Sequence, residues 1–309
     1  MSTGLSAAVA RHGRWLLIAG LLAGVAVPGA AGAVAPLVGP LVVALLFLAV
    51  LRLGPGDLAK GRRALGPSVG TAVALQLALP LAVIGGLALT GTLGSAWGQG
   101  LVLMLAAAPI TGAPHIARMA GGDPAVALRQ VVAGTALLPL TALPVFALMP
   151  AFGSPADVSL AVARLLAVIA LAGGCALALR ATGIVRGTPR SLDRIDAVAA
   201  VLLAVVVVGL MSAVGAAIRD EPARFAATMA LVLVATFGLQ AVAAFFWRDS
   251  INRAAMAVVT ANRNVALFLG VLPPALVADL LLFIGCYQIP MYLTPLILPG
   301  IIGRGTRQG

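Results

Sequence analysis

Charged residues are scarce in this chain of 309 residues, because Asp, Glu, Lys and Arg together make up only 9% of it. Hydrophobic residues make up 61%, and the mean hydropathy is +1.11. Soluble proteins do not combine these values, so the composition excludes a soluble enzyme or binding domain. The apolar runs of about 20 residues are typical of transmembrane helices, whereas a β-barrel would show shorter alternating segments. We therefore predict an all-α integral membrane protein.

Histidine and cysteine are also rare, with two residues each. Cys175 and Cys286 both lie in apolar runs, and we interpret them as small buried residues rather than as a disulfide framework or a metal site. The sequence contains no phosphate-binding glycine loop, no His/Cys metal cluster and no nucleophilic triad. We therefore do not expect an enzyme, nor a cofactor other than a coupling ion.

The net charge of +11 could suggest a nucleic-acid partner, but the basic residues lie singly or in short clusters between apolar runs. That distribution reports membrane topology instead. The expected partners are therefore the lipid bilayer and a small molecule.

Windows of about 20 residues identify ten spans, at about 15–33, 35–53, 68–91, 97–120, 124–149, 159–182, 194–217, 223–246, 253–274 and 276–299.

Basic residues concentrate on one side of this topology. With the N-terminus inside, sixteen of the twenty Lys and Arg residues are internal: Arg11, Arg14, Arg52, Lys60, Arg62, Arg63, Arg118, Arg129, Arg180, Arg186, Arg190, Arg194, Arg248, Arg253, Arg304 and Arg307. The outer side holds Arg164, Arg219 and Arg224, and Arg263 lies within a span. Because positive loops stay cytoplasmic, we expect a multi-pass protein of the inner (plasma) membrane with both termini in the cytoplasm.

The first span has a second interpretation. Arg11 and Arg14 precede an apolar run with small residues at 29–33, which also fits a cleaved signal peptide. The apolar run continues to Val50, and the charge alternation is best with the first span retained. We therefore favour ten spans over nine.

Ten spans divide into five plus five, residues 1–150 and 151–309. An odd number in each half inverts the second half, as in transporters built from inverted repeats. The fourth span contains Pro109–His115, with two prolines around a glycine, and the ninth contains the polar cluster Thr260–Asn264. Both sequences should interrupt a helix, and backbone groups freed at that depth must line a cavity or bond to a neighbouring helix. We predict that the two interruptions occupy equivalent places in the two halves.

At these residues the chain resembles the bile acid:sodium symporter superfamily, which also includes arsenite and organic-anion carriers. Ala108 to Asp123 is similar to the family's fourth-helix pattern, and Ala261 to Leu267 is similar to its ninth-helix pattern "GxRNVGLAL". Leu75-Gln76 with Pro80 resembles its third-helix "QxxxxP". The resemblance implies ten helices, a panel domain and a core domain. It also implies that broken helices 4 and 9 cross at the core centre beside the substrate cavity.

The resemblance also predicts which ion ligands are missing. In sodium-coupled members a ninth-helix glutamate and a fourth-helix Ser-Asn pair supply oxygen ligands. Here those positions fall on Val259 or Thr260 and on Pro114-His115. Because hard cations bind oxygen donors, the first sodium site is degenerate, while a second site would retain Gln76 as a sodium ligand. One sodium ion, a proton or no coupling ion are all compatible with this pattern.

Individual residues of the two interruptions allow more than one role. Arg263 could contact an anionic substrate or hold the broken helices together by bonding carbonyls of the fourth, and we favour the second role. Asn262 and Asn264 could satisfy freed backbone groups. His115 could be a satisfied interior group or a protonation switch. The residues expected to bind substrate or ion are Gln76, Thr111, Pro114, His115, Thr260, Asn262, Arg263 and Asn264.

The function expected from these features is secondary active transport of a small organic anion by alternating access, because arginine and the positive ends of half-helices attract negative charge. The alternatives are an uncoupled carrier, or a membrane-embedded receptor or enzyme that uses the same midplane pocket. A channel is disfavoured because its polar lining should involve several helices, whereas polarity here concentrates in two.

Overall fold

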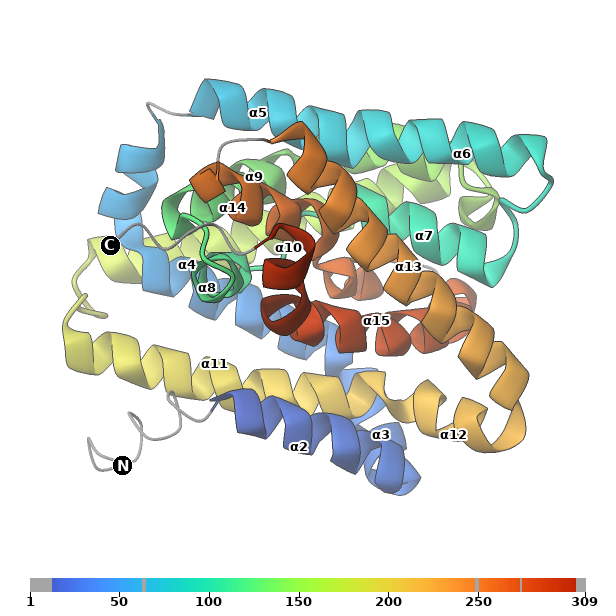
Figure 1. Ribbon diagram of the computed structural model, residues 1–309. Coiled ribbons are helices and arrows are strands. Elements are labelled where there is room, and N and C mark those ends of the chain that lie inside the picture. Colours follow the sequence, from blue (N-terminus) through green and yellow to red (C-terminus); the bar gives the residue numbers. More distant parts are fainter. Residues whose placement is uncertain (1–12, 63–64, 248–249, 273, 304–309) are drawn as a thin grey trace.

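The protein is described here from a computed structural model that covers residues 13–62, 65–247, 250–272 and 274–303. Over these residues all regular elements are helices and there is no strand, although one isolated antiparallel bridge joins two loops. The predicted all-α class is therefore confirmed (Figure 1).

The helices follow the predicted order of spans. In the first half they are α2 (Gly13–Ala26), α3 (Pro28–Val34), η1 (Ala35–Leu37), α4 (Val38–Arg62), α5 (Leu65–Val73), the π-helix η2 (Ala74–Ala78), α6 (Leu79–Leu89), α7 (Ala96–Ala106), α8 (Ala113–Met119) and α9 (Pro124–Ala147). In the second half they are η3 (Pro150–Phe152), α10 (Pro155–Ala181), α11 (Pro189–Leu210), α12 (Ser212–Asp220), α13 (Pro222–Phe246), α14 (Ser250–Ala261), η4 (Val265–Gly270) and α15 (Pro274–Ile301).

Capping residues set the starts of several helices. Ser154 and Asp157 form a capping box at α10, and the Thr188 hydroxyl accepts from Ser191 N–H at α11. Because proline is favoured at the first helical position, the Ser-Pro and Thr-Pro sequences begin these two helices at Pro155 and Pro189, before the predicted spans. Asp123 caps α9 by accepting from Ala125 N–H at 2.7 Å, and α9 begins at Pro124, where the span was predicted to begin.

Within the described ranges, seven helices are long and apolar enough to cross a membrane, which indicates a multi-pass membrane protein: Pro28–Arg52, Gly66–Leu89, Pro124–Ala147, Pro155–Ala181, Pro189–Asp220, Pro222–Phe246 and Leu280–Ile301. Each of the predicted first, fourth and ninth spans is divided, so neither part alone reaches the length of about 20 residues that a bilayer requires. The first is divided at Val27, where Pro28 cannot continue the helix. Ten spans therefore remain a prediction.

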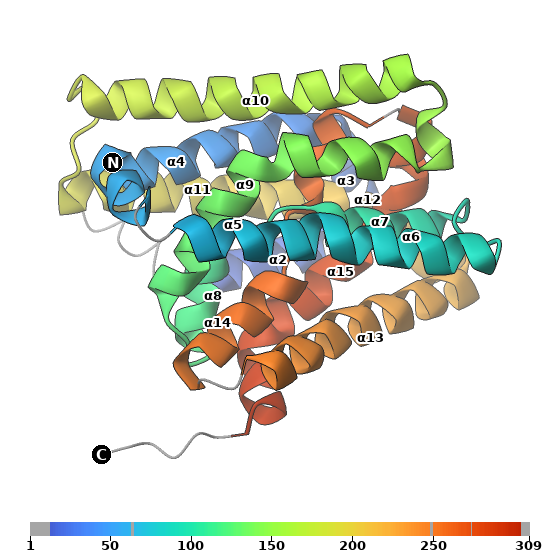
Figure 2. The same ribbon diagram turned by 90° about the horizontal axis from the view of Figure 1, so that it is seen from above.

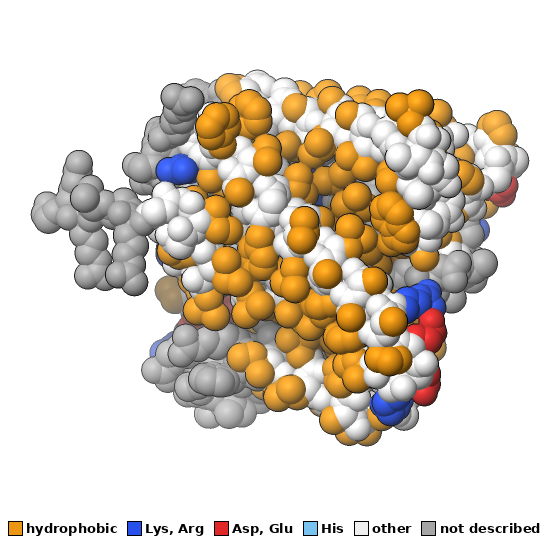
Figure 3. All heavy atoms as spheres, turned by 45° about the vertical axis from the view of Figure 1, so that its right-hand side comes forward, with side chains coloured by type: hydrophobic (Ala, Val, Ile, Leu, Met, Phe, Trp, Pro, Cys, Tyr) orange, Lys and Arg blue, Asp and Glu red, His pale blue; other side chains and the backbone are white. Residues whose placement is uncertain are grey.

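The outer surface is apolar on the faces that a bilayer would cover. Exposed large apolar residues include Leu89, Leu140, Leu171, Val234, Phe246 and Leu296. On the face in Figure 3, hydrophobic side chains spread across the middle, and charged side chains lie near its edges. Cys175 is also exposed on α10, so the prediction that it is buried is wrong, whereas Cys286 is buried as predicted. The reason is that α10 buries the positions of Ala172 and Ala176 and leaves Cys175 outside that face.

The helices form two packed groups. In the first, α2 and α3 pack along α11, and α4 packs between α10 and α11. In the second, α5, α8 and α14 pack around α9, and α13 packs against α14 and α15. Figure 1 shows α5–α6 and α11–α12 along opposite sides of the molecule, and Figure 2 shows α10 and α13 on opposite sides of the bundle. Contacts of α9 with α10, of η4 with α4, and of α15 with α11 and α12 join the groups.

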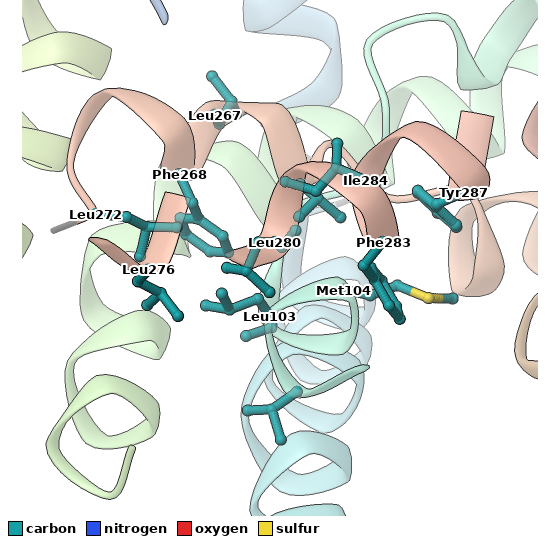
Figure 4. Packing of buried hydrophobic residues seen from close by; sticks show 14 of the residues in the cluster. Leu103, Met104, Leu267, Phe268, Leu272, Leu276, Leu280, Phe283, Ile284 and Tyr287 are labelled. Carbon is teal, nitrogen blue, oxygen red and sulfur yellow. The ribbon is translucent and has the colours of Figure 1, made fainter. Parts of the chain in front are cut away.

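The main hydrophobic core lies where α7, η4 and α15 meet (Figure 4). Leu103 of α7 lies beside Leu280 of α15, and Phe268 of η4 lies beside Leu272 and Leu276. These side chains are almost fully buried. This core holds α7 and η4 on one side of the two interruptions, whereas α8 and α14 on the other side pack in a second cluster with α9 and α13.

Candidate functional site

The chain between α7 and α8 is non-helical over residues 107–112, as the proline and glycine content predicted. Ala107 is extended, with φ −65° and ψ 153°, and its N–H makes the last helical bond of α7. Pro109 has no amide donor, so it cannot contribute a helical hydrogen bond at this break. Pro114 lies in the first turn of α8, where a missing N–H costs nothing.

The second interruption covers residues 262–264, between α14 and η4. Here Arg263 pairs with Pro109 in the isolated antiparallel bridge. Ile110 N–H donates to Asn262 O at 2.9 Å, and Asn264 N–H donates to Ala108 O at 2.8 Å. Unpaired backbone groups are costly at membrane depth. Here each interruption supplies hydrogen-bond partners for backbone groups of the other. The two broken helices therefore meet at one crossover, defined here as residues 107–112 and 262–264.

A tyrosine from α15 completes the backbone bonding. The Tyr287 hydroxyl accepts from Arg263 N–H at 2.5 Å and donates to Ala261 O at 2.5 Å. It therefore caps the C-terminus of α14, where carbonyls lack helical partners. Tyr287 was not predicted from the sequence, because a lone tyrosine in an apolar span carries no local signal of such a role.

Asn262 is fully buried and joins three helices. Its Oδ1 accepts from Gln240 Nε2 of α13 at 3.2 Å and from Thr294 Oγ1 of α15 at 3.1 Å. Its Nδ2 donates to Met291 O at 3.3 Å. The α-helical donor for that carbonyl would be residue 295, which is a proline without an N–H. Asn262 thus satisfies a backbone group freed by Pro295, as expected for the asparagines of this cluster.

The π-helix η2 supplies the partner of Arg263. Leu79 N–H bonds to Ala74 O, which is one residue further back than in an α-helix. The next donor in this register would be Pro80, which has no N–H. Leu75 O is therefore open to an outside donor, and Arg263 Nη2 donates to it at 2.9 Å. The π-helical register and Pro80 together therefore leave the Leu75 carbonyl free for Arg263.

Arg263 is 1% exposed and is the largest of the almost fully buried side chains. Its Nε and Nη1 have no hydrogen-bond partner, and it forms no ion pair, among the residues that the structure describes. Arg263 bonds a backbone carbonyl, but this carbonyl belongs to the third span rather than to the fourth, where we expected it. The Ala108 and Asn262 carbonyls already accept hydrogen bonds from backbone N–H groups of the crossover, which is why the guanidinium bonds elsewhere.

Gln76 is fully buried beside the crossover. Its Oε1 accepts from Thr141 Oγ1 of α9 at 3.4 Å, and its Nε2 has no partner in the described residues. A Cβ atom added at Gly134 would collide with this amide and would lie 2.8 Å from Pro109 Cδ. Gly134 therefore lets α9 approach both Gln76 and the crossover.

We expect the substitution Gly134→Ala to lower the free energy of unfolding by about 1–3 kcal/mol, the usual cost of overpacking. The matched control is Gly86→Ala in α6, where an added Cβ meets no atom within 4 Å. There alanine should stabilise the helix by up to about 1 kcal/mol. Thermal unfolding in detergent measures both variants, and equal shifts of the same sign would contradict the close approach at Gly134.

The other predicted site residues lie around the crossover. Thr260, in the last turn of α14, is buried and its hydroxyl has no partner in the described part of the chain. Thr111 and Asn264 are partly buried at the two interruptions, and Pro114 is partly buried in α8. Asn264 lies at the N-cap of η4 without a side-chain cap bond. Its amide is therefore available to another group.

His115 is exposed, so the interpretation as an interior polar group is wrong. The short helix α8 buries Ala113, Ile116 and Ala117. This one-sided burial is the i, i+3, i+4 pattern of a helix that packs on one face. The face that carries His115 points away from the packing, and a protonation role for it stays a prediction.

Two buried residues outside the predicted set contribute to the site. Gln240 of α13 donates to Thr294 of α15 at 2.8 Å, and both side chains are fully buried. A signal for Gln240 existed, since Leu239-Gln240 repeats the Leu75-Gln76 dipeptide in the other half.

The described residues contain no group of three or more His, Cys, Asp or Glu side chains that could hold a metal ion.

Two cavities lie near the crossover helices. One of about 370 Å³ is lined by Ala96, Trp97, Arg224, Ala227, Thr228, Leu231, Leu282 and Phe283. The other, of about 390 Å³, is lined by Ala35, Pro36, Val38, Gly39, Pro40, Leu269, Gly270, Leu272, Val277 and Leu281. The second lies between η1–α4 and η4–α15, which belong to the two different helix groups. Its wall includes the end of η4, the segment that directly follows the crossover.

Comparison with known proteins gives no further identification. No protein-family model matches the chain, and no curated protein matches it.

Proposed function

We propose that this protein is a secondary active transporter of a small organic anion that works by alternating access. The observation that carries the proposal is the crossover, in which two broken helices pair through Pro109 and Arg263 in the protein interior. Interrupted helices that meet at membrane depth are typical of transporter binding sites. A buried arginine in such a place is a functional feature by default. An anion is favoured because the guanidinium has two N–H-bearing nitrogens without partners in the described residues.

Side-chain pairs around the crossover support the inverted repeat. Gln76 of the third predicted span bonds Thr141 of the fifth, and Gln240 of the eighth bonds Thr294 of the tenth. These positions are equivalent when residues 1–150 and 151–309 are treated as repeats. The proposed arrangement therefore has ten spans, with both termini cytoplasmic in the inner membrane.

The two helix groups supply the moving parts of the proposed mechanism. The group of α2, α3, α4, α10 and α11 corresponds to the panel domain of the resembled family, and the group that contains the crossover corresponds to its core domain. Movement of one group against the other would open the 390 Å³ cavity to alternate sides. Its volume lies in the range of small-molecule sites, about 300–1,000 Å³.

The proposal is tested first with a panel of radiolabelled carboxylates. Purified protein is screened for carboxylates that raise its melting temperature, because a ligand that binds the folded state stabilises it. Each carboxylate that does so is then offered to proteoliposomes. We expect concentrative or exchange uptake of at least one, recovered chemically unchanged. Binding without uptake would favour a receptor, and chemical conversion would favour an enzyme.

The cavity is tested with a variant that fills it. An added Cβ at Gly270 meets no atom within 4 Å, so we expect Gly270→Phe to reduce uptake at least tenfold without lowering the melting temperature. Gly238→Phe on the exposed face of α13 is the matched control, because its added Cβ also meets open space. Uptake by proteoliposomes measures both, and equal activity of the two variants would exclude this cavity as the substrate path.

A further inference from the structure

Arg263 carries its positive charge in the protein interior without a carboxylate partner. It is 1% exposed and forms no ion pair in the described residues. Two helices, α7 and α14, end at the crossover, and two short segments, α8 and η4, begin there. The helix ends therefore contribute partial charges of both signs, and the hydrogen bond of the guanidinium goes to a backbone carbonyl.

Helix C-termini and unwound carbonyls are the groups that hold coupling cations in transporters with broken helices. In this protein one such carbonyl bonds to a side chain instead. Leu75 O, left without a helical donor in η2, accepts from Arg263 Nη2 at 2.9 Å. The residue next to Leu75 is Gln76, the predicted second sodium ligand.

The Gln76 side chain is also poorly placed for a cation. Its amide oxygen, the atom that sodium would use, accepts from Thr141 Oγ1. Its Nε2 atom is a donor and points to the position of Gly134, whose added Cβ would also meet Pro109. Pro109 is the bridge partner of Arg263, so amide and guanidinium share one buried neighbourhood. A monovalent cation about 4 Å from the guanidinium would bind roughly 1,000-fold more weakly at an effective dielectric constant of about 20.

We propose that Arg263 is a built-in cation at the crossover, which takes the place of a coupling sodium ion and makes the protein independent of sodium. This inference rests on the proposed transport function, since only a transporter needs a coupling ion there. It assigns the sodium-type position to the chain's own side chain, and Gln76 becomes a positioning residue of that arrangement.

The test measures sodium binding without transport. The melting temperature of purified protein is compared in sodium chloride and in choline chloride at equal ionic strength, and binding of ²²Na⁺ is measured in parallel. We expect no sodium-specific change for the wild-type protein or for Arg263→Lys, which keeps the charge. Arg263→Gln removes the charge but keeps an amide, and it should gain a saturable, sodium-specific rise in melting temperature.

Two results would overturn the proposal. One is sodium-specific stabilisation of the wild-type protein, and the other is a folded Arg263→Gln variant that ignores sodium as completely as the wild type. If Arg263→Gln does not fold, Gln76→Glu tests the proposal instead. Its carboxylate should pair with the guanidinium and raise the melting temperature, and sodium should then have no effect on that temperature. A sodium response of Gln76→Glu would count against the built-in cation. Failure of carboxylate uptake would instead count against transport, since sodium binding is measured separately.

Discussion

The substitution Asn262→Ala is expected to lower the free energy of unfolding by about 2–4 kcal/mol, because buried polar groups left without partners cost about 1–3 kcal/mol each. Alanine removes the acceptor of Gln240 Nε2 and Thr294 Oγ1 and the donor to Met291 O. Pro295 offers that carbonyl no N–H, so no helical bond can replace the lost one. Thermal unfolding in detergent should show a decrease in Tm of roughly 5–10 °C.

The matched control for this variant is Asn264→Ala, two residues away in the same interruption. The Asn264 side chain makes no cap bond to η4, and the backbone bond from Asn264 N–H to Ala108 O survives the substitution. We expect its stability to remain within about 0.5 kcal/mol of the wild type, while uptake falls if its free amide contacts substrate. Comparable destabilisation by the two substitutions would show that the three-helix junction at Asn262 is not a special support of the crossover.

The substitution Tyr287→Phe should have an effect of similar size. It removes the hydroxyl that accepts from Arg263 N–H and donates to Ala261 O. Both backbone groups stay buried, so the expected loss of unfolding free energy is about 2–4 kcal/mol. Because the α14 end would also fray, uptake should fall together with Tm. Thermal unfolding and uptake on the same preparations measure the two effects.

Tyr292→Phe, on the same helix, is the control for the loss of a tyrosine hydroxyl. The Tyr292 hydroxyl is buried and has no partner among the described residues, so its removal should leave Tm unchanged or slightly higher. If Tyr287→Phe were as mild as Tyr292→Phe, the capping role of Tyr287 would be disproved.

Local sequence was enough to locate the two interruptions. Pro109 and Pro114 lie on either side of Gly112, and this combination disfavours a continuous helix. Proline spacing alone is not sufficient, since Pro139 and Pro144 have the same spacing within the continuous helix α9. Composition likewise settled the membrane class, because a chain with 61% hydrophobic residues cannot cover its surface with polar groups. Span boundaries were less predictable, since capping residues such as Ser154 and Thr188 extend helices beyond their apolar parts.

Contacts between distant residues could not be predicted from these patterns. Tyr287 bonds to residues 24 and 26 positions earlier, and nothing in its own segment distinguishes it from Tyr292. The exposed position of His115 followed from which face of α8 packs inward, and a seven-residue helix gives too short a pattern to show this. Hydropathy indicates how apolar a segment is, but it does not indicate which helix packs against each face of that segment.

Arg263 shows the same difference between local features, which the sequence predicts, and distant contacts, which it does not. The position of a charged residue within an apolar segment, next to a helix break, could be predicted from the sequence, since both facts are local. The identity of its partner, Leu75 O, 188 positions away, could be found only from the packed structure. The physical reason is that a proline frees a carbonyl locally, whereas the donor that reaches that carbonyl is chosen by the packing of helices from both halves of the chain.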